Sequence, residues 1–243
     1  MGSPERAAIG IGSDTRAEGP AVARAALLNV LAHLVALAAA GLWLRRGSAA
    51  FSVDERIAFF RDAESVRLWQ VGWGLWILAA AGSVGFIATV VAALPKDARA
   101  RGAVVSVACA AGIDLLGDTL QAVLLPTLVG PDVPRWVFVA CESVVSGIGT
   151  VCANGLYSVA VVLLTSALGA RASTATKATA YLTFAGGMLL AVSALVPSPW
   201  LLQGSAPITI VAFCAWTLAL TRDVRREARE ARRIEDAPVN RRS

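Results

Sequence analysis

The chain has 243 residues, of which 56% are hydrophobic and only 16% are charged, with a formal net charge of +5. A soluble domain typically carries about 25% charged residues, so this composition excludes a disordered chain, a collagen-like chain and a nucleic-acid-binding module, and disfavours a soluble enzyme. The shortfall in charge falls in long apolar runs, which is typical of a polytopic membrane protein.

Residues 1–22 are mostly polar and small, and we predict a disordered cytoplasmic leader there. The first apolar run ends at Leu44 and is followed by Arg45 and Arg46 instead of a small-residue cleavage site. We therefore expect this run to remain in the protein as a membrane span and not to be removed as a signal peptide.

A transmembrane domain is predicted over residues 23–221, in six apolar runs. These runs are 23–44, 69–94, 102–128, 136–168, 179–196 and 200–221. A helix needs about 20 residues to cross the bilayer, and no run shows the period of two that is typical of a barrel strand. The predicted fold is an all-α, polytopic transmembrane helix bundle with six spans.

The basic residues predict the orientation of this bundle. With the N-terminus inside, 16 of the 22 Lys and Arg residues lie in cytoplasmic segments. Because basic residues favour the cytoplasmic side, we expect both termini to be cytoplasmic, in a multi-pass protein of the cell inner (plasma) membrane.

The first outer loop contains a helix start signal. Ser52 to Glu55 has the pattern of a capping box, with Ser52 as the N-cap and Glu55 three residues later. Ile57 and Phe60 then give the next turns an apolar side. We predict an amphipathic helix at about 52–66 on the outer surface, and the alternative is the frayed start of the second span.

Residues 222–243 are predicted to form a basic cytoplasmic tail. Six arginines in it recur at helical spacing on one face: Arg222, Arg225, Arg226, Arg229, Arg232 and Arg233. Such a stripe suits the anionic lipid headgroups of the cytoplasmic leaflet, at about 1 kcal/mol per well-placed residue. The alternative is a solvated helix that only fixes orientation.

Three carboxylic acids lie inside the apolar runs, and we predict them as catalytic residues: Asp114, Asp118 and Glu142. A carboxylate inside the bilayer costs roughly 2.5–3.5 kcal/mol and needs a reason. Counting depth along antiparallel neighbours places Asp118 and Glu142 in the outer half, where we expect them to face each other. With no basic residue at that depth in any run, one of the two would hold a proton.

Other polar and aromatic residues repeat at helical spacing beside these acids. The predicted substrate-binding set is Trp73, Trp76, Gln121, Ser146, Asn154, Tyr157 and His33. The tryptophans would form an aromatic wall of an acidic pocket, and helix packing is the alternative. His33 would join a proton relay, or would form a single hydrogen bond between helices.

No motif indicates a cofactor or a metal ion. The four cysteines form no Cys-x-x-Cys pair, the chain has one histidine, and neither a Walker loop nor a Gly-x-Gly-x-x-Gly is present. We expect the partners to be the lipid bilayer and a membrane protein, and no nucleic acid.

Three stretches of the sequence resemble a group of uncharacterised bacterial integral membrane proteins. These are residues 68–76, the pair Asp114 and Asp118 ahead of Leu125 and Pro126, and Glu142 followed by 153–158. The resemblance implies a six-helix membrane protein with acids at these positions, and it implies no activity.

Three functions remain open from the sequence. The acidic site would handle a small or lipid-like molecule in a proton-coupled transporter of small solutes. A protonated carboxyl beside tryptophan faces would also suit an enzyme that modifies a lipid or isoprenoid, by analogy with membrane terpene cyclases. In an accessory membrane subunit, the same acids would hold helices together or bind a basic residue of a partner.

Overall fold

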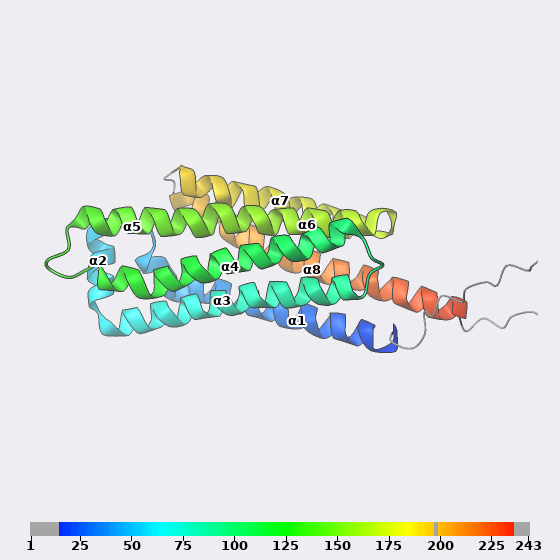
Figure 1. Cartoon of the computed structure of the whole chain (residues 1–243). Helices are drawn as coiled ribbons and strands as arrows, with labels where there is room; N and C mark the ends of the chain where they lie inside the picture. Colours follow the sequence, from blue (N-terminus) through cyan, green and yellow to red (C-terminus); the bar gives the residue numbers. More distant parts are fainter. Residues whose placement is uncertain (1–14, 197–198, 236–243) are drawn as a thin grey trace, which may run out of the picture.

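The computed structural model describes residues 15–196 and 199–235, and every element within them is a helix. Long helices lie side by side along one axis and form an elongated bundle (Figure 1). Five stretches are long and apolar enough to cross a membrane: Gly19–Gly47, Ala63–Ala92, Ala98–Thr127, Arg135–Arg171 and Gln203–Glu230. The chain therefore has the fold of a helical membrane protein.

The described residues form eight α-helices and four short helical segments of π or 3₁₀ type. Their bounds are α1 Thr15–Ala39, η1 Ala40–Leu44, η2 Arg45–Gly47, α2 Val53–Arg61, α3 Ala63–Ala92, α4 Ala98–Thr127, α5 Arg135–Gly147, η3 Ile148–Ala153, α6 Asn154–Leu168, η4 Gly169–Arg171, α7 Thr174–Leu195 and α8 Pro199–Glu235. Of the short elements, η1 and η3 are π-helical, and η2 and η4 are 3₁₀-helical. Because η3 joins α5 to α6 without a break, these three elements form one long rod (Figure 1).

Helix α7 covers the fifth apolar run of the sequence, at 179–196. Within the described residues it is not among the stretches that meet the length and hydropathy criteria for a span. It packs along α8 and α6 (Figure 1). The sixth span therefore stays a prediction.

Both ends of the described chain are helical. Helix α1 begins at Thr15, inside the segment predicted as a leader, and residues 1–14 of that segment lie outside the described residues. Helix α8 continues through the start of the predicted tail to Glu235 and projects beyond the bundle (Figure 1). The arginine stripe is thus carried on a continuous helix, as its spacing predicts.

The capping box at the start of α2 is confirmed. The Ser52 hydroxyl accepts the backbone N–H of Glu55, and the Glu55 carboxylate accepts the backbone N–H of Ser52 at 2.8 Å. The helix ends at Arg61, and the Asp62 carboxylate then caps α3 by accepting the backbone N–H of Ser65 at 2.8 Å. Helix α2 packs against α3 and α4 at one end of the bundle (Figure 1).

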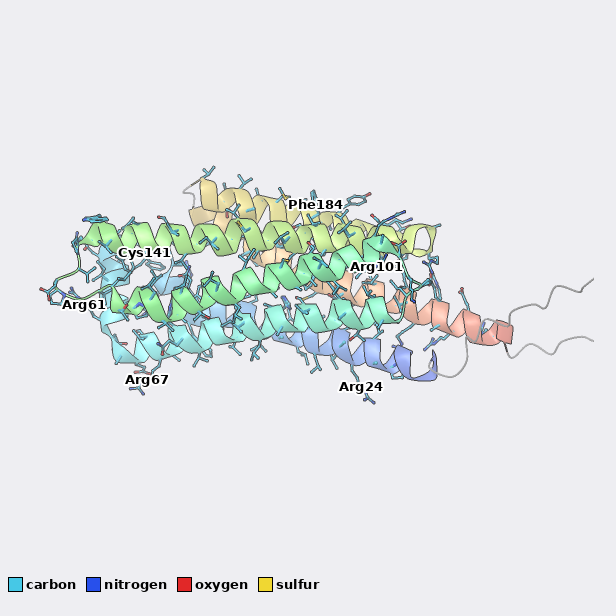
Figure 2. All side chains as sticks on the ribbon, in the orientation of Figure 1. Arg24, Arg61, Arg67, Arg101, Cys141 and Phe184 are labelled. Atoms are coloured by element: carbon cyan, nitrogen blue, oxygen red, sulfur yellow. The ribbon has the colours of Figure 1, made fainter. Side chains whose placement is uncertain are left out.

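The buried apolar residues form two clusters along the bundle. The larger joins α1, α3, α4, α6 and α8 around Phe86, Leu164 and Trp216. The second lies at the α2 end, which the sequence predicts to be outside, and we therefore call it the outer aromatic cluster: Leu44, Phe60, Trp69, Leu125, Val129 and Phe138. Basic residues mark both ends, with Arg61 and Arg67 at the α2 end and Arg24 and Arg101 towards the other (Figure 2).

Candidate functional site

Two of the predicted acids lie one turn apart on α4. Asp118 is buried, with 8% of its surface exposed, and Asp114 is half-buried. Neither carboxylate forms an ion pair within the described part of the chain. Because they are separated by four residues, both project from the same side of the helix and repel each other.

The π-helical turn η3 lies against α4 at the level of these acids. Gln121 donates from Nε2 to the Ser146 hydroxyl at 3.0 Å, which fixes the register of α4 against α5. A Cβ atom on Gly117 would lie 3.4 Å from the Cα atom of Gly149, so the two backbones touch. Asp118 therefore lies opposite the start of η3, and π-helical turns occur frequently at functional sites.

Tyr157 faces the acids from α6. Its hydroxyl group lies within hydrogen-bonding reach of Asp114 and is in electrostatic contact with Asp118. The hydroxyl is buried, and Asp114 is the carboxylate next to it. Asn154, by contrast, donates from Nδ2 to the Thr150 carbonyl at 3.0 Å, within its own rod. Its amide therefore stabilises the return from π-helix to α-helix.

Helix α3 covers the other side of α4. Trp69 donates from Nε1 to the Gln121 carbonyl oxygen at 2.8 Å, and Gln70 donates from Nε2 to the Ala122 carbonyl oxygen at 3.4 Å. Pro126 has no N–H to offer the Ala122 carbonyl four residues earlier, so Gln70 satisfies an oxygen that the helix itself leaves free.

These two bonds place Trp73 level with Asp118, and Trp76 level with Asp114, because α3 and α4 run antiparallel. The Trp73 Nε1 atom is buried and has no hydrogen-bond partner within the described residues. Both rings also pack on the outer aromatic cluster, with Trp73 5.5 Å from Trp69. Trp69 is only 2% exposed, and its indole bridges α3 and α4 inside the bundle.

Glu142 has a different environment from the aspartates. Its carboxylate accepts a hydrogen bond from Arg56 of α2 at 2.5 Å, and the two side chains are 9% and 6% exposed. The Arg56 guanidinium also lies 5.7 Å from the centre of the Phe138 ring. No apolar run carries a basic residue at this depth, as noted from the sequence, but α2 packs over the bundle end and buries Arg56 next to the fourth apolar run, so Glu142 is not left without a cation.

The register also separates Glu142 from Asp118. Asp118 lies opposite Ile148, six residues along the rod from Glu142, which is about 9 Å at 1.5 Å per residue. The depth count missed this offset because it took both helices to start at the membrane edge. Glu142 thus forms an ion pair with Arg56 and not a carboxyl pair with Asp118. Asp118 instead has Asp114 as its acidic neighbour, and no described basic residue pairs with either aspartate.

His33 belongs to another polar cluster, which joins α1, α3 and α8. Its Nδ1 atom lies 2.8 Å from the Asn29 carbonyl oxygen, and its ring packs on Phe213 at 5.0 Å. The Asn29 amide donates to Thr217 at 3.3 Å and accepts from Ser83 at 3.4 Å. The described hydrogen bond of His33 therefore lies within α1 and is not the interhelical bond given as the alternative; Asn29 makes the bonds between helices.

The arginines of α8 are not equivalent. Arg226 lies within 3.8 Å of Asp223 and 4.0 Å of Glu230, and it donates to the Arg171 carbonyl oxygen at 3.2 Å. Arg222, Arg225, Arg229 and Arg233 are exposed and form no ion pair with any described side chain; the side chain of Arg232 lies outside the described residues.

Sequence reasoning missed Arg56 as a site residue. The signal was present, since Arg56 and Phe60 are four residues apart and share the face of α2 that turns inward.

Among the described residues, no group of three or more His, Cys, Asp or Glu side chains is placed to hold a metal ion. Comparison of the chain with protein-family models, with curated proteins and with solved structures gave no match.

Proposed function

We propose that this membrane protein binds a small, positively charged molecule at the Asp114–Asp118 pair and exchanges it for protons. The single observation that carries the proposal is the contrast between two sets of buried acids. Glu142 has its own cation in Arg56, whereas the aspartates have none among the described residues. A proton or a ligand cation is therefore the charge that would stabilise them in the bilayer.

The groups around the aspartates support a ligand larger than a proton. The Trp73 indole N–H is buried without a hydrogen-bond partner among the described residues, and the buried Tyr157 hydroxyl lies beside Asp114; the two residues stand on helices that flank α4. A buried donor left unsatisfied costs about 1–3 kcal/mol, which a bound molecule carrying an acceptor atom would offset. The supported ligand class is a small organic cation that also bears a hydrogen-bond acceptor.

The lipid-modifying enzyme has less support. That chemistry needs aromatic faces around an open cavity, and Trp73 and Trp76 pack on the outer aromatic cluster. Neither of the two grooves described at the surface is lined by Asp114 or Asp118. For an accessory subunit, the acids would bind a basic residue of a partner, and the buried position of Asp118 at the α4–η3 contact disfavours this.

Metabolite profiling of cells and medium tests the exchange function. Three sets of cells would express one protein each, at equal level: the wild-type chain, Asp114→Asn/Asp118→Asn, or the exposed control Asp132→Asn. We expect a cationic metabolite to be redistributed by the wild type and by the control, and not by the double variant. Equal profiles in all cells would contradict the proposal.

We also infer six spans with both termini in the cytoplasm of a cell whose inner membrane holds the protein. In a cysteine-free background, Asp132→Cys would lie outside and Lys96→Cys inside. A membrane-impermeant maleimide should label the first in intact cells and the second only after permeabilisation. The reverse pattern would contradict this orientation.

A further inference from the structure

An arginine-lined groove runs between α1 and α8, away from the acidic pair. It has a volume of about 560 Å³, which lies in the usual range for small-molecule sites. Its lining residues are Ala23, Ala26, Leu27, Leu218, Thr221, Arg222, Arg225, Arg226 and Arg229. We propose that this groove binds one acidic phospholipid, with the phosphate on the arginines and an acyl chain along the leucines.

Charge complementarity supports an anionic occupant. Arg222, Arg225 and Arg229 stand at helical spacing of three and four residues, so their guanidinium groups share one face of α8. Within residues 15–196 and 199–235 none of the three forms an ion pair, whereas the neighbouring Arg226 is engaged by Asp223 and Glu230. Three uncompensated guanidinium groups beside one groove suit a phosphate, which arginine binds through paired N–H donors.

The apolar part of the groove supports a lipid over a free phosphate. Leu27 of α1 is 56% exposed and Leu218 of α8 is 52% exposed, and both line the groove. Leu218 precedes Arg222 by one turn of α8, on the side towards the bundle. A single ligand would thus meet apolar side chains and arginines in the order that a lipid presents its chain and its headgroup.

The position along the bundle agrees with this order. Helix α8 leaves the bundle where α1 begins, and its arginines lie on this projecting part (Figure 1). With the orientation inferred from the basic residues, this is the cytoplasmic leaflet, in which anionic lipids attract basic segments. The groove does not include the acidic pair, so lipid binding in the groove can be tested independently of the exchange function.

Native mass spectrometry of the purified full chain tests the proposal directly. The probes are dioleoylphosphatidylglycerol, dioleoylphosphatidylcholine and inorganic phosphate, each at the same concentration. We expect one tight adduct with phosphatidylglycerol, a weaker one with phosphatidylcholine and none with phosphate. Phosphate binding as strong as the lipid's, or equal binding of the two lipids, would overturn the proposal.

A matched pair of variants locates the site. Arg225→Gln/Arg229→Gln should lower the affinity for phosphatidylglycerol about 30-fold, from the contribution of two basic residues near a lipid headgroup. Lys96→Gln/Arg101→Gln removes the same charge from exposed basic residues that belong neither to the stripe nor to the groove lining, and should change the affinity less than 3-fold. Equal losses in both double variants would reduce the effect to net charge and overturn the site.

A photoreactive residue in the groove identifies the occupant in the membrane. With benzoylphenylalanine in place of Leu27, irradiation in vesicles of phosphatidylcholine and phosphatidylglycerol should give an adduct with the mass of one phosphatidylglycerol. A cross-link to residues 1–14 or to a second copy of the chain, without a lipid adduct, would show that another occupant fills the groove and would contradict the proposal.

Discussion

Removing the cation of the Arg56–Glu142 pair should destabilise the protein strongly. Both side chains are more than nine-tenths buried and their atoms lie 2.5 Å apart, so Arg56→Met leaves the Glu142 carboxylate without a partner. Breaking a buried pair from one side typically costs about 3–5 kcal/mol, whereas replacing both partners by apolar residues is often neutral or stabilising. We expect Arg56→Met/Glu142→Met to be more stable than Arg56→Met alone.

The chain supplies a matched control on the same helix. Asp54 of α2 pairs with Arg135, and their side chains are 65% and 69% exposed. An exposed pair of this kind contributes about 0–1 kcal/mol. Arg135→Met, like Arg56→Met, removes the arginine of an ion pair that involves α2. It should nevertheless leave stability nearly unchanged, because this pair is exposed.

Thermal unfolding of the purified protein in detergent, followed by tryptophan fluorescence, measures the difference. A loss of about 3–5 kcal/mol corresponds to a Tm lower by roughly 6–20 °C in a chain of this size. The double variant should recover most of that loss. If Arg56→Met lowers the Tm no more than Arg135→Met does, the pair does not stabilise the bundle end and the reasoning is refuted.

Two further predictions concern local structure. Hydrogen bonds from the Ser52 hydroxyl and backbone N–H hold the pKa of Glu55 below its ordinary 4.5. The start of α2 should therefore keep its hydrogen-exchange protection at pH values above the ordinary pKa and lose it as the pH falls through the lowered pKa. Ser52→Ala should show no such step. A Cβ atom on Gly186 would lie 3.2 Å from the Thr209 Cα atom, so Gly186→Ala should lower stability in detergent by about 1–3 kcal/mol. A Cβ atom on Gly112 would have nothing within 4 Å, so Gly112→Ala should raise stability by up to about 1 kcal/mol. Equal effects of the two substitutions would contradict the close α7–α8 contact.

The long helices were predictable because a single physical requirement decides them. A backbone in the bilayer has to satisfy its own hydrogen bonds, so an apolar run of about 20 residues has almost no alternative to a helix. The capping box at Ser52 was predictable for a similar reason, since both of its hydrogen bonds are local in sequence.

The arrangement of the site was less predictable because it depends on contacts between distant segments. The register of α4 against the rod is fixed by Gln121 with Ser146 and by the backbone contact of Gly117 with Gly149, and no local pattern encodes it. The π-helical turn η3 likewise has no local signature in the sequence. Counting depth from the ends of the runs therefore placed Asp118 opposite the wrong residue.

Arg56 shows how one misplaced helix changes the chemistry of a site. As a surface helix, the segment 52–66 would have kept its arginine in solvent and left Glu142 as a titrating acid. Because α2 packs inward, Glu142 becomes the structural partner of Arg56, and our proposal assigns the titrating role to Asp114 and Asp118. Glu142→Gln is accordingly expected to reduce stability more than it changes proton exchange.

The proposed exchange requires the Asp114–Asp118 pair to carry an exchangeable proton inside the bundle. Infrared difference spectroscopy of the purified protein across a pH jump tests it most directly, because a protonated carboxyl has its own C=O stretch. We predict a band that is lost in Asp118→Asn and retained in the exposed control Asp132→Asn. A spectrum without a protonated carboxyl band, or with one that survives Asp114→Asn/Asp118→Asn, would contradict the account.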